Sequence, residues 1–454
     1  MVKIHFLGAS GTVTGSKFYL ETTEKNILID CGLFQGKKDL RISNWKPLPV
    51  SVGSIDVVLL THGHLDHTGY LPRLVKAGFK GNIVGTAPTL AIARIILLDS
   101  AKINEEEAEI ANREGYSKHK PAMPLYSLND AENTITLFKA EELDRWMQLS
   151  ENIQYRFRYN GHIIGSAFIE LDISGKRFVF SGDVGRPEDL LLDPPVKPEW
   201  ADFLFVESTY GNKLHPPDNV EERLVSLVNK TLYARGNLLI PSFAVERLQS
   251  LMYLFWKLYK KNKIPHIPIF IDSPMGNDVL AIFERFPKWH KLSKKEYKAM
   301  CRHFNIIDSY RQTWETIDDP RPKIVIAGSG MVTGGRILTY LQQLVDNPNT
   351  NILLVGYMAE GTRGRALLEG AKELKIFGKY YSVNAGVYHE ESLSAHSDQK
   401  ELLDWMASIK NIPERVFLIH GEQEALAAFK DKIEDIYKWK VRIPELFETA
   451  ELIF

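Results

Sequence analysis

The residues best suited to chemistry are three histidines and an aspartate within six positions, His62, His64, Asp66 and His67. Imidazole nitrogens and carboxylate oxygens are ligands that Zn²⁺ takes in proteins. The group follows an apolar run at 55–60, so we expect it on a loop at the end of a strand. Four donors exceed what one tetrahedral ion with an open position requires. The spacing therefore predicts two metal ions.

Two further strand ends offer donors for the same ions. His162 precedes a stretch of small and apolar residues, and Asp183 lies between small residues after the apolar run at 177–180. A carboxylate with small neighbours is suited to bridging two ions about 3.5–4 Å apart. A lone histidine at a strand end is more often a packing residue than a ligand. That interpretation does not account for four donors in six positions.

The elements that must position these residues are short apolar runs alternating with helix-length segments. The runs are rich in β-branched residues and include 26–30, 55–62, 177–183, 203–207, 237–241, 324–328 and 416–420. Continuous apolar runs of this length are typical of strands buried on both faces. Residues 87–109 and 221–261 carry helical periodicity. The pattern predicts a layered α/β fold.

Composition excludes several classes of protein. A chain of 454 residues is too long for one ordinary domain. The 56 Lys and Arg residues nearly cancel the 57 Asp and Glu residues, which excludes a protein that coats nucleic acid or membrane through net charge. No apolar run approaches the roughly 18 residues of a membrane span. Only Cys31 and Cys301 are present, and the first residues do not resemble a signal peptide, so we expect a cytoplasmic protein.

The donor residues and Asp30 resemble the motifs of the metallo-β-lactamase superfamily. Farther along, segments 205–211, 393–398 and 419–422 resemble the motifs of the β-CASP nucleases, the branch that acts on nucleic acids. These segments contain Glu207, His396 and His420. The resemblance covers about residues 4–424 and is closest to the RNA-cleaving members, which include the endonuclease subunit of the eukaryotic cleavage and polyadenylation factor.

The resemblance implies a specific architecture. A four-layer αββα metallo-β-lactamase domain is expected from residues 1–208 and 391–454, with an α/β β-CASP domain inserted at 209–390. Substrate RNA is expected in the cleft between the domains, where ligand sites tend to form.

The resemblance also implies a set of roles around two Zn²⁺ ions. His62, His64 and His162 are expected to hold one ion, and Asp66, His67 and His420 the other. Asp183 is expected to bridge them. Asp30 and Glu207 are expected to orient the ligand histidines and His396. His396 is the candidate general acid for the leaving 3′-oxygen, so the products carry 5′-phosphate and 3′-hydroxyl ends.

The inserted segment contains turns rich in glycine and arginine. Residues 330–337 nearly match the phosphate-loop pattern G-x-x-x-x-G-K-[ST], but Arg336 replaces the lysine and Ile337 the hydroxyl residue. A nucleotide-hydrolysing loop is therefore not expected, although backbone N–H groups and guanidinium groups still suit phosphodiesters. Arginines on an exposed turn are an equal alternative. The candidate substrate-binding residues are Gly330, Gly334, Gly335, Arg336, Arg363, Arg365, Ser394 and Ala395.

The expected function is that of a zinc-dependent ribonuclease in RNA processing or decay. We expect endonucleolytic cleavage, with 5′–3′ exonucleolytic cleavage as a further option, on single-stranded or partly structured RNA. No membrane partner is expected, and a homodimer is left open. The alternatives are a hydrolase of small esters or thioesters and a non-catalytic scaffold in RNA processing. The long insertion argues against the first and the complete ligand set against the second.

Overall fold

The computed structural model describes residues 1–115, 119–216 and 219–454, and the chain forms two compact units. The first unit contains residues 1–189, 193–214 and 396–454, and the second contains 190–192 and 215–395. The junctions expected at 208/209 and 390/391 are observed at 214/215 and 395/396.

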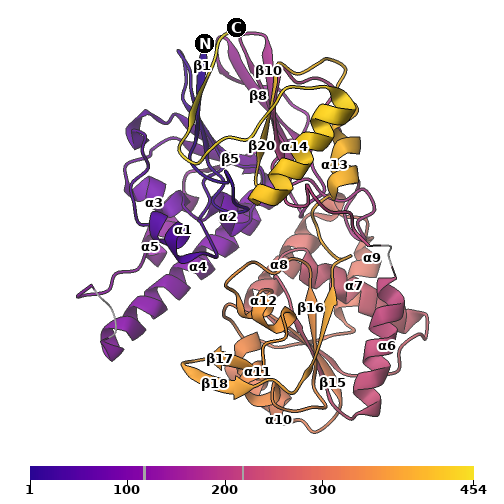
Figure 1. Ribbon diagram of the computed structural model, residues 1–454. Coiled ribbons are helices and arrows are strands. Elements are labelled where there is room, and N and C mark those ends of the chain that lie inside the picture. Colours follow the sequence, from indigo (N-terminus) through magenta and orange to yellow (C-terminus); the bar gives the residue numbers. More distant parts are fainter. Residues whose placement is uncertain (116–118, 217–218) are drawn as a thin grey trace. The chain divides into compact units, whose positions relative to one another are not determined.

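Within the described residues, the first unit contains two mixed sheets (Figure 1). The first sheet has the order β22 (Thr449–Leu452), β1 (Val2–Phe6), β2 (Phe18–Glu21), β3 (Ile27–Ile29), β4 (Val57–Leu59), β5 (Asn82–Thr86), β6 (Phe138–Glu141). The second has the order β21 (Val441–Arg442), β20 (Arg415–Ile419), β11 (Phe203–Glu207), β10 (Lys176–Phe180), β9 (Ala167–Ile173), β8 (Ile153–Tyr159), β7 (Met147–Ser150). Because β1 pairs with β22, the two ends of the chain lie side by side.

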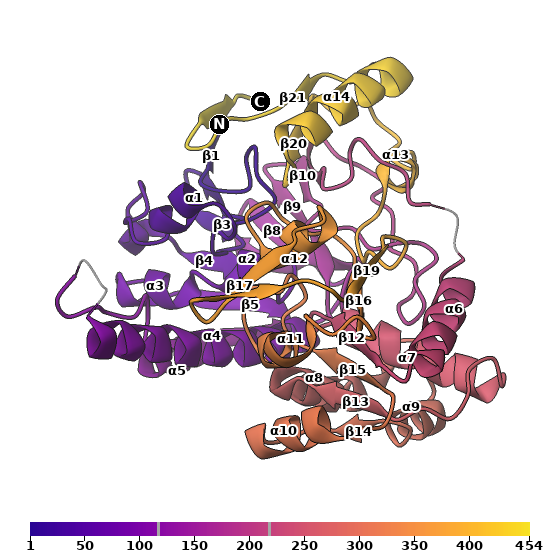
Figure 2. The same cartoon turned by 60° about the horizontal axis from the view of Figure 1, so that its bottom comes forward.

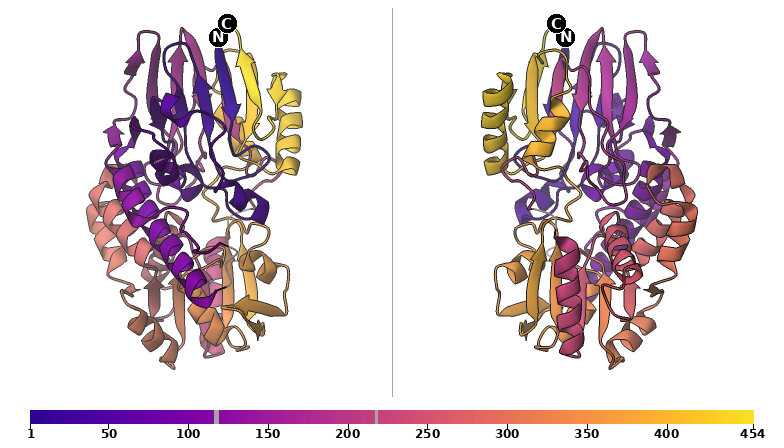
Figure 3. Two further views of the ribbon diagram at one scale, coloured as in Figure 1. Left: turned by 90° about the vertical axis from the view of Figure 1, so that its left-hand side faces the viewer. Right: turned by 90° about the vertical axis from the view of Figure 1, so that its right-hand side faces the viewer.

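Helices cover the outer face of each sheet, as expected for a four-layer αββα domain. The helices of this unit are α1 (Lys38–Ser43), α2 (Leu65–Thr68), α3 (Leu71–Lys76), α4 (Ala87–Glu114), α5 (Leu128–Ile135), α13 (Gln399–Met406) and α14 (Gln423–Tyr437). Helices α3, α4 and α5 pack against the first sheet, and α13 and α14 pack against the second (Figure 3). The expected layer order is confirmed.

An aromatic core fills the space between the two sheets of the first unit. Phe180, Phe205 and Phe417 come from three neighbouring strands of the second sheet and stack in sequence, with ring centroids 4.2 and 4.8 Å apart. Phe6 of the first sheet packs against Phe417 at 5.4 Å. These residues are fully buried. The packed sheets give the loops at the strand ends a rigid support.

The second unit is built on a parallel sheet with the order β14 (Asn305–Ile306), β13 (Ile269–Asp272), β15 (Lys323–Ala327), β12 (Asn237–Pro241), β16 (Asn351–Val355), β19 (Gly386–Glu390). Its helices are α6 (Val220–Tyr233), α7 (Arg247–Lys260), α8 (Pro274–Arg285), α9 (Lys294–Cys301), α10 (Tyr310–Asp318), α11 (Ile337–Leu344) and α12 (Arg363–Leu368). Helices α11 and α12 and the hairpin of β17 (Glu373–Ile376) and β18 (Lys379–Ser382) share one apolar cluster with the sheet (Figure 2). The inserted α/β domain is confirmed.

The central strands of this sheet are buried at almost every position. This explains why their sequences are apolar throughout rather than alternating. Among the described residues, no helix has both the length and the apolar character needed to cross a membrane.

Candidate metal centre

The donor-rich segment forms a loop and a single turn of helix after strand β4. His64 occupies the N-cap of α2 in an extended conformation, so His62 and His64 precede the helix whereas Asp66 and His67 lie in it. Gly63 separates the two histidines where a Cβ atom would lie 2.6 Å from the side chain of Ile92. The change from extended to helical backbone directs neighbouring donors to different sides of the loop.

The remaining donors come from loops at other strand ends of the same unit. His162 follows β8, Asp183 follows β10, and His420 follows β20. Asp30, after β3, and His420 both have positive φ, 56° and 50°. Such left-handed conformations are uncommon for residues other than glycine and cluster at functional sites.

One group of donors consists of His62, His64, His162 and Asp183, whose ligand atoms lie within 4.8 Å of one another. His64 Nδ1 lies 3.0 Å from His62 Nε2 and 3.3 Å from His162 Nε2. Asp183 Oδ2 lies 3.5 Å from His62 Nε2 and 3.6 Å from His162 Nε2. Three imidazoles and one carboxylate oxygen thus face a common point.

A second group consists of Asp66, His67 and His420. His67 Nε2 lies 3.3 Å from His420 Nε2, and Asp66 Oδ2 lies 3.4 Å from the same His420 nitrogen. The other oxygen of Asp183, Oδ1, faces this group at 3.3 Å from His67 Nε2. The two oxygens of one carboxylate are therefore divided between the two groups.

The charges in this centre favour bound cations. Burial lowers the pKa of His64 to about 4 and, with the neighbouring His67, lowers the pKa of His62 well below its usual value. Burial acts to raise the pKa of Asp183, but the imidazoles of His420, His67 and His62 lower it well below the usual range. Asp183 Oδ1 is buried without a hydrogen-bond donor. The neutral imidazoles of His62 and His64 and the ionised Asp183 carboxylate, with its unfilled oxygen, fit the ligand chemistry of zinc.

Asp30 binds the ring nitrogen of His67 that does not face the donor groups. Its carboxylate accepts from the backbone N–H and the hydroxyl of Thr61, both at 2.8 Å, and from His67 Nδ1 at 2.8 Å. Because a carboxylate can only accept, His67 carries its proton on Nδ1 and directs Nε2 toward the second group.

Glu207 and His396 form a pair at the edge of the same centre. His396 Nδ1 lies 3.2 Å from Glu207 Oε2, and its Nε2 lies 4.0 Å from Asp183 Oδ2. Burial acts to lower the pKa of His396, but the Glu207 carboxylate raises it to about 9. The imidazole remains one-fifth exposed, whereas Glu207 is fully buried. The sequence predicted these residues only through the family resemblance.

Two hydroxyl residues of the centre were missed by sequence reasoning. Thr61 contacts Asp30, and Thr209 Oγ1 lies 3.2 Å from His420 Nδ1 and donates to the backbone carbonyl of His420. With its proton on that carbonyl, the Thr209 oxygen accepts from His420 Nδ1, which leaves Nε2 to face the donors. The only available signal was that Thr61 adjoins His62 and Thr209 lies two residues after Glu207.

The predicted glycine-rich turn lies in the second unit, between β15 and α11. Ser329 Oγ accepts from the backbone N–H groups of Thr333 and Gly334, at 3.0 and 3.1 Å. Gly335 has a φ of 71°, and a Cβ atom there would lie 2.5 Å from the carbonyl oxygen of Gly328. Gly330 lies in the same turn, where a Cβ atom would meet the ring of Phe243 at 2.5 Å. A serine hydroxyl therefore occupies N–H groups that a phosphate was expected to use.

The predicted arginines have partners within the second unit. Arg336 lies 3.8 Å from Asp272 and stacks on the Tyr310 ring at 4.1 Å. Arg363 donates to the carbonyls of Val332, Thr333 and Lys375 at 3.3, 3.1 and 2.6 Å, and Arg365 pairs with Glu369 at 2.7 Å. Ser394 and Ala395 end this unit, directly before His396. Contact of all these residues with RNA stays a prediction.

Three family models match the chain. The model of the metallo-β-lactamase superfamily matches residues 11–116, and that of the β-CASP domain matches residues 248–367. The model of a Zn-dependent metallo-hydrolase RNA specificity domain matches residues 380–444.

Similar proteins extend over nearly the whole chain. Ribonuclease TTHA0252 of Thermus thermophilus is 33% identical over 93% of this chain and 93% of its own length. Transcription termination factor FttA is 30% identical in Methanocaldococcus jannaschii, over 98% of this chain and 70% of the relative, and 30% identical in Methanosarcina mazei, over 100% and 72%. A crystal structure of a protein of unknown function from Enterococcus faecalis shares the fold, with a TM-score of 0.54 at 14% identity over 99% of this chain and 100% of that one. The chain therefore belongs to the β-CASP ribonuclease family of the metallo-β-lactamase superfamily.

Proposed function

We propose that this protein is a zinc-dependent ribonuclease that hydrolyses phosphodiester bonds with two bound ions. The observation that carries the proposal is the division of Asp183, whose Oδ2 faces one donor group and whose Oδ1 faces the other. The name of the Thermus relative supports RNA as the substrate.

The two donor groups assign a ligand set to each ion. His62, His64 and His162 would hold one ion, and Asp66, His67 and His420 would hold the other, with Asp183 shared. When bound, such ions lower the pKa of a coordinated water and neutralise charge on the phosphate.

The protein's own side chains orient the metal ligands and supply the proton for the leaving 3′-oxygen. Asp30 fixes the tautomer of His67, and Glu207 holds His396 through Nδ1, which leaves Nε2 on the side of Asp183. In the proposed reaction a water molecule releases a proton to solvent as its oxygen bonds to phosphorus, the bond from phosphorus to the 3′-oxygen breaks, and His396 Nε2–H protonates that oxygen. His396 then regains a proton from solvent. The products are a 5′-phosphate and a 3′-hydroxyl.

The deciding experiment uses RNA labelled at its 5′ end, with the purified chain, a chelator and added zinc. We expect cleavage that stops with the chelator and returns with zinc, at two zinc ions per chain. Labelling of the new ends with and without phosphatase treatment identifies the 5′-phosphate. A circular RNA of the same sequence is the matched substrate, because only an endonuclease cuts it. Turnover of thioesters without RNA cleavage would establish the hydrolase alternative, and zinc binding without turnover would establish the scaffold.

We also propose a cytoplasmic location. Light scattering on the active fraction decides whether the protein is a monomer or a homodimer. Cys31 and Cys301 are both free thiols, as expected in a reducing compartment. Cell fractionation tests the location.

A further inference from the structure

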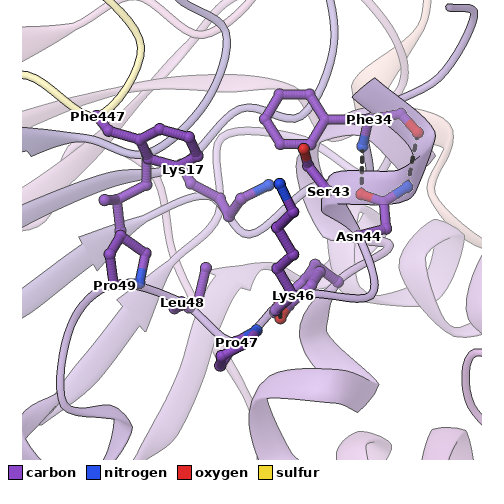
Figure 4. A pocket seen from close by; sticks show the side chains of 11 residues that line it. Lys17, Phe34, Ser43, Asn44, Lys46, Pro47, Leu48, Pro49 and Phe447 are labelled. Atoms are coloured by element: carbon purple, nitrogen blue, oxygen red, sulfur yellow. Dashed lines mark hydrogen bonds between the residues drawn. The ribbon is translucent and has the colours of Figure 1, made fainter. Parts of the chain in front are cut away.

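The first unit contains a pocket of about 220 Å³ whose lining residues include none of the metal-binding candidates (Figure 4). Phe34, Tyr70 and Phe447 supply aromatic surface, and Pro47 and Leu48 supply aliphatic surface. Lys17 and Lys46 bring two ammonium groups to this apolar lining.

The walls of the pocket are held in place before any ligand arrives. Asn44 accepts from the backbone N–H of Phe34 at 2.9 Å and donates to its carbonyl at 2.8 Å (Figure 4). The Lys17 ammonium donates to the carbonyls of Gly15 and Gly32, at 3.0 and 2.6 Å, and lies 4.5 Å from the centre of the Phe34 ring. A ligand would therefore find aromatic surfaces that are already ordered, which reduces the entropy cost of binding.

The pocket shares its backbone with the metal centre. Tyr70 lies three residues after His67, and its N–H donates to the carbonyl of Cys31 at 2.8 Å. Cys31 in turn donates to the carbonyl of His67 at 2.7 Å. Two backbone hydrogen bonds therefore connect the Tyr70 wall of the pocket to the metal-ligand candidate His67.

The lining of the pocket includes an exposed cation and an exposed aromatic ring. Lys46, just after α1, is exposed and forms no ion pair with a carboxylate among the described residues. Phe447 is 51% exposed. Residues 37–46 carry four basic residues and one acidic residue, Asp39, in a chain whose net charge is −1, so this segment has a local excess of positive charge.

We propose that this pocket binds one base of the RNA substrate, with Lys46 beside the adjoining phosphate. The exposed Phe447 ring next to the Lys46 cation is the combination that single-stranded nucleic acid uses, because bases stack on aromatic rings and phosphates pair with cations. An apolar peptide would use the aromatic lining but not the Lys46 cation. The inference rests on the proposed ribonuclease function and assigns a subsite to it.

The test measures equilibrium binding of a short fluorescent single-stranded RNA to the full chain, with zinc present, in parallel with single-turnover cleavage. Phe447→Ala should weaken binding roughly 5- to 100-fold, the range for loss of one base stack. Lys46→Gln should lower the slope of log K against log salt by about 0.7, the value for one phosphate contact on a single strand. Matched controls are Ile412→Ala and Lys432→Gln, which change exposed residues of the same unit outside the pocket lining.

The decisive arm uses RNAs that each lack one base. In the wild-type protein, one abasic position should weaken binding as much as Phe447→Ala does, and in Phe447→Ala that position should cost nothing further. The proposed base pocket is overturned if no abasic position weakens binding to the wild-type protein. It is also overturned if the abasic position weakens binding to Phe447→Ala as much as it weakens binding to the wild type. Because binding is read separately from cleavage, a protein that binds in this pattern without cutting refutes the ribonuclease and leaves the pocket standing. Circular dichroism confirms that each variant is folded.

Discussion

His67 Nδ1 donates to Asp30 Oδ2 across 2.8 Å, and this contact determines which nitrogen of His67 faces the donor groups. Both Asp30 oxygens are in use, since Oδ1 accepts from the backbone N–H of Thr61 and Oδ2 also accepts from its hydroxyl. The residue therefore acts on the metal centre through His67 without belonging to either donor group.

Asp30→Asn should weaken zinc binding or activity by about 10- to 100-fold, the usual cost of losing a hydrogen-bond partner behind a metal ligand. In asparagine one carboxylate oxygen becomes an NH₂ donor, so this NH₂ must face either the backbone N–H of Thr61 or, with the amide reversed, the donors that Oδ2 accepts from, His67 Nδ1–H and the Thr61 hydroxyl. Zinc titration and single-turnover cleavage measure the effect. Asp56→Asn is the control, because Asp56 braces a loop through Asn26 outside the centre. Equal zinc affinity in Asp30→Asn and the wild type would contradict the assigned role.

His64→Ala should remove zinc from the first donor group and abolish cleavage, while the chain stays folded. The reason is that His64 Nδ1 faces both His62 and His162, so its loss opens the centre of that group. Metal analysis, a melting curve and cleavage are measured on one preparation. His266→Ala removes an exposed histidine of the second unit and should change none of them. A His64→Ala protein that keeps two zinc ions and full activity would show that the ligand set is wrong.

The donor loop could be predicted because its residues are adjacent in sequence. His62, His64, Asp66 and His67 need only one strand end to position them, and the apolar run before them indicates that strand. His420 could not be predicted in this way, since it is 353 residues from His67 and reaches it only through the pairing of β20 with β11. A match to a known motif substituted for that spatial information.

Side-chain partners were the part that sequence patterns could not predict. Arg363 appeared as a cation on a turn, but its guanidinium holds the carbonyls of Val332 and Thr333. Nothing in the sequence pattern singles out Lys17, yet it is buried beside Phe34 and donates to the carbonyls of Gly15 and Gly32. In both cases the partner atoms are backbone carbonyls, which every residue possesses and no pattern identifies.

Lys17 should make stability rise between about pH 8 and pH 10.5. Burial lowers its pKa from 10.5 to about 8, so in this range the unfolded chain holds the proton and the folded chain releases it. When the unfolded state binds more protons, the free energy of unfolding increases with pH. The measurement is the melting temperature of the wild type minus that of Lys17→Met across this range, at constant ionic strength and zinc. A constant difference would contradict a titrating buried amine.

His396→Ala should separate proton transfer from metal binding. The ring is held by Glu207 and belongs to neither of the two donor groups assigned to the ions, so zinc content should stay at the wild-type level. The backbone at this position should also persist, because Ser397 donates its N–H to Val184 and its hydroxyl to Gly185 independently of the ring. Loss of a general acid should lower the single-turnover rate about 10²- to 10⁴-fold.

An RNA whose leaving 3′-oxygen is replaced by sulfur provides the sharp comparison, since a thiolate leaves without a proton. On that substrate the His396→Ala protein should approach the wild-type rate, and Glu207→Gln, which keeps an acceptor for Nδ1, should show a smaller deficit on ordinary RNA. If the deficit is the same on both substrates while zinc is retained, the proton comes from another group. If the variant instead melts early, His396 stabilises the segment before α13 rather than the reaction.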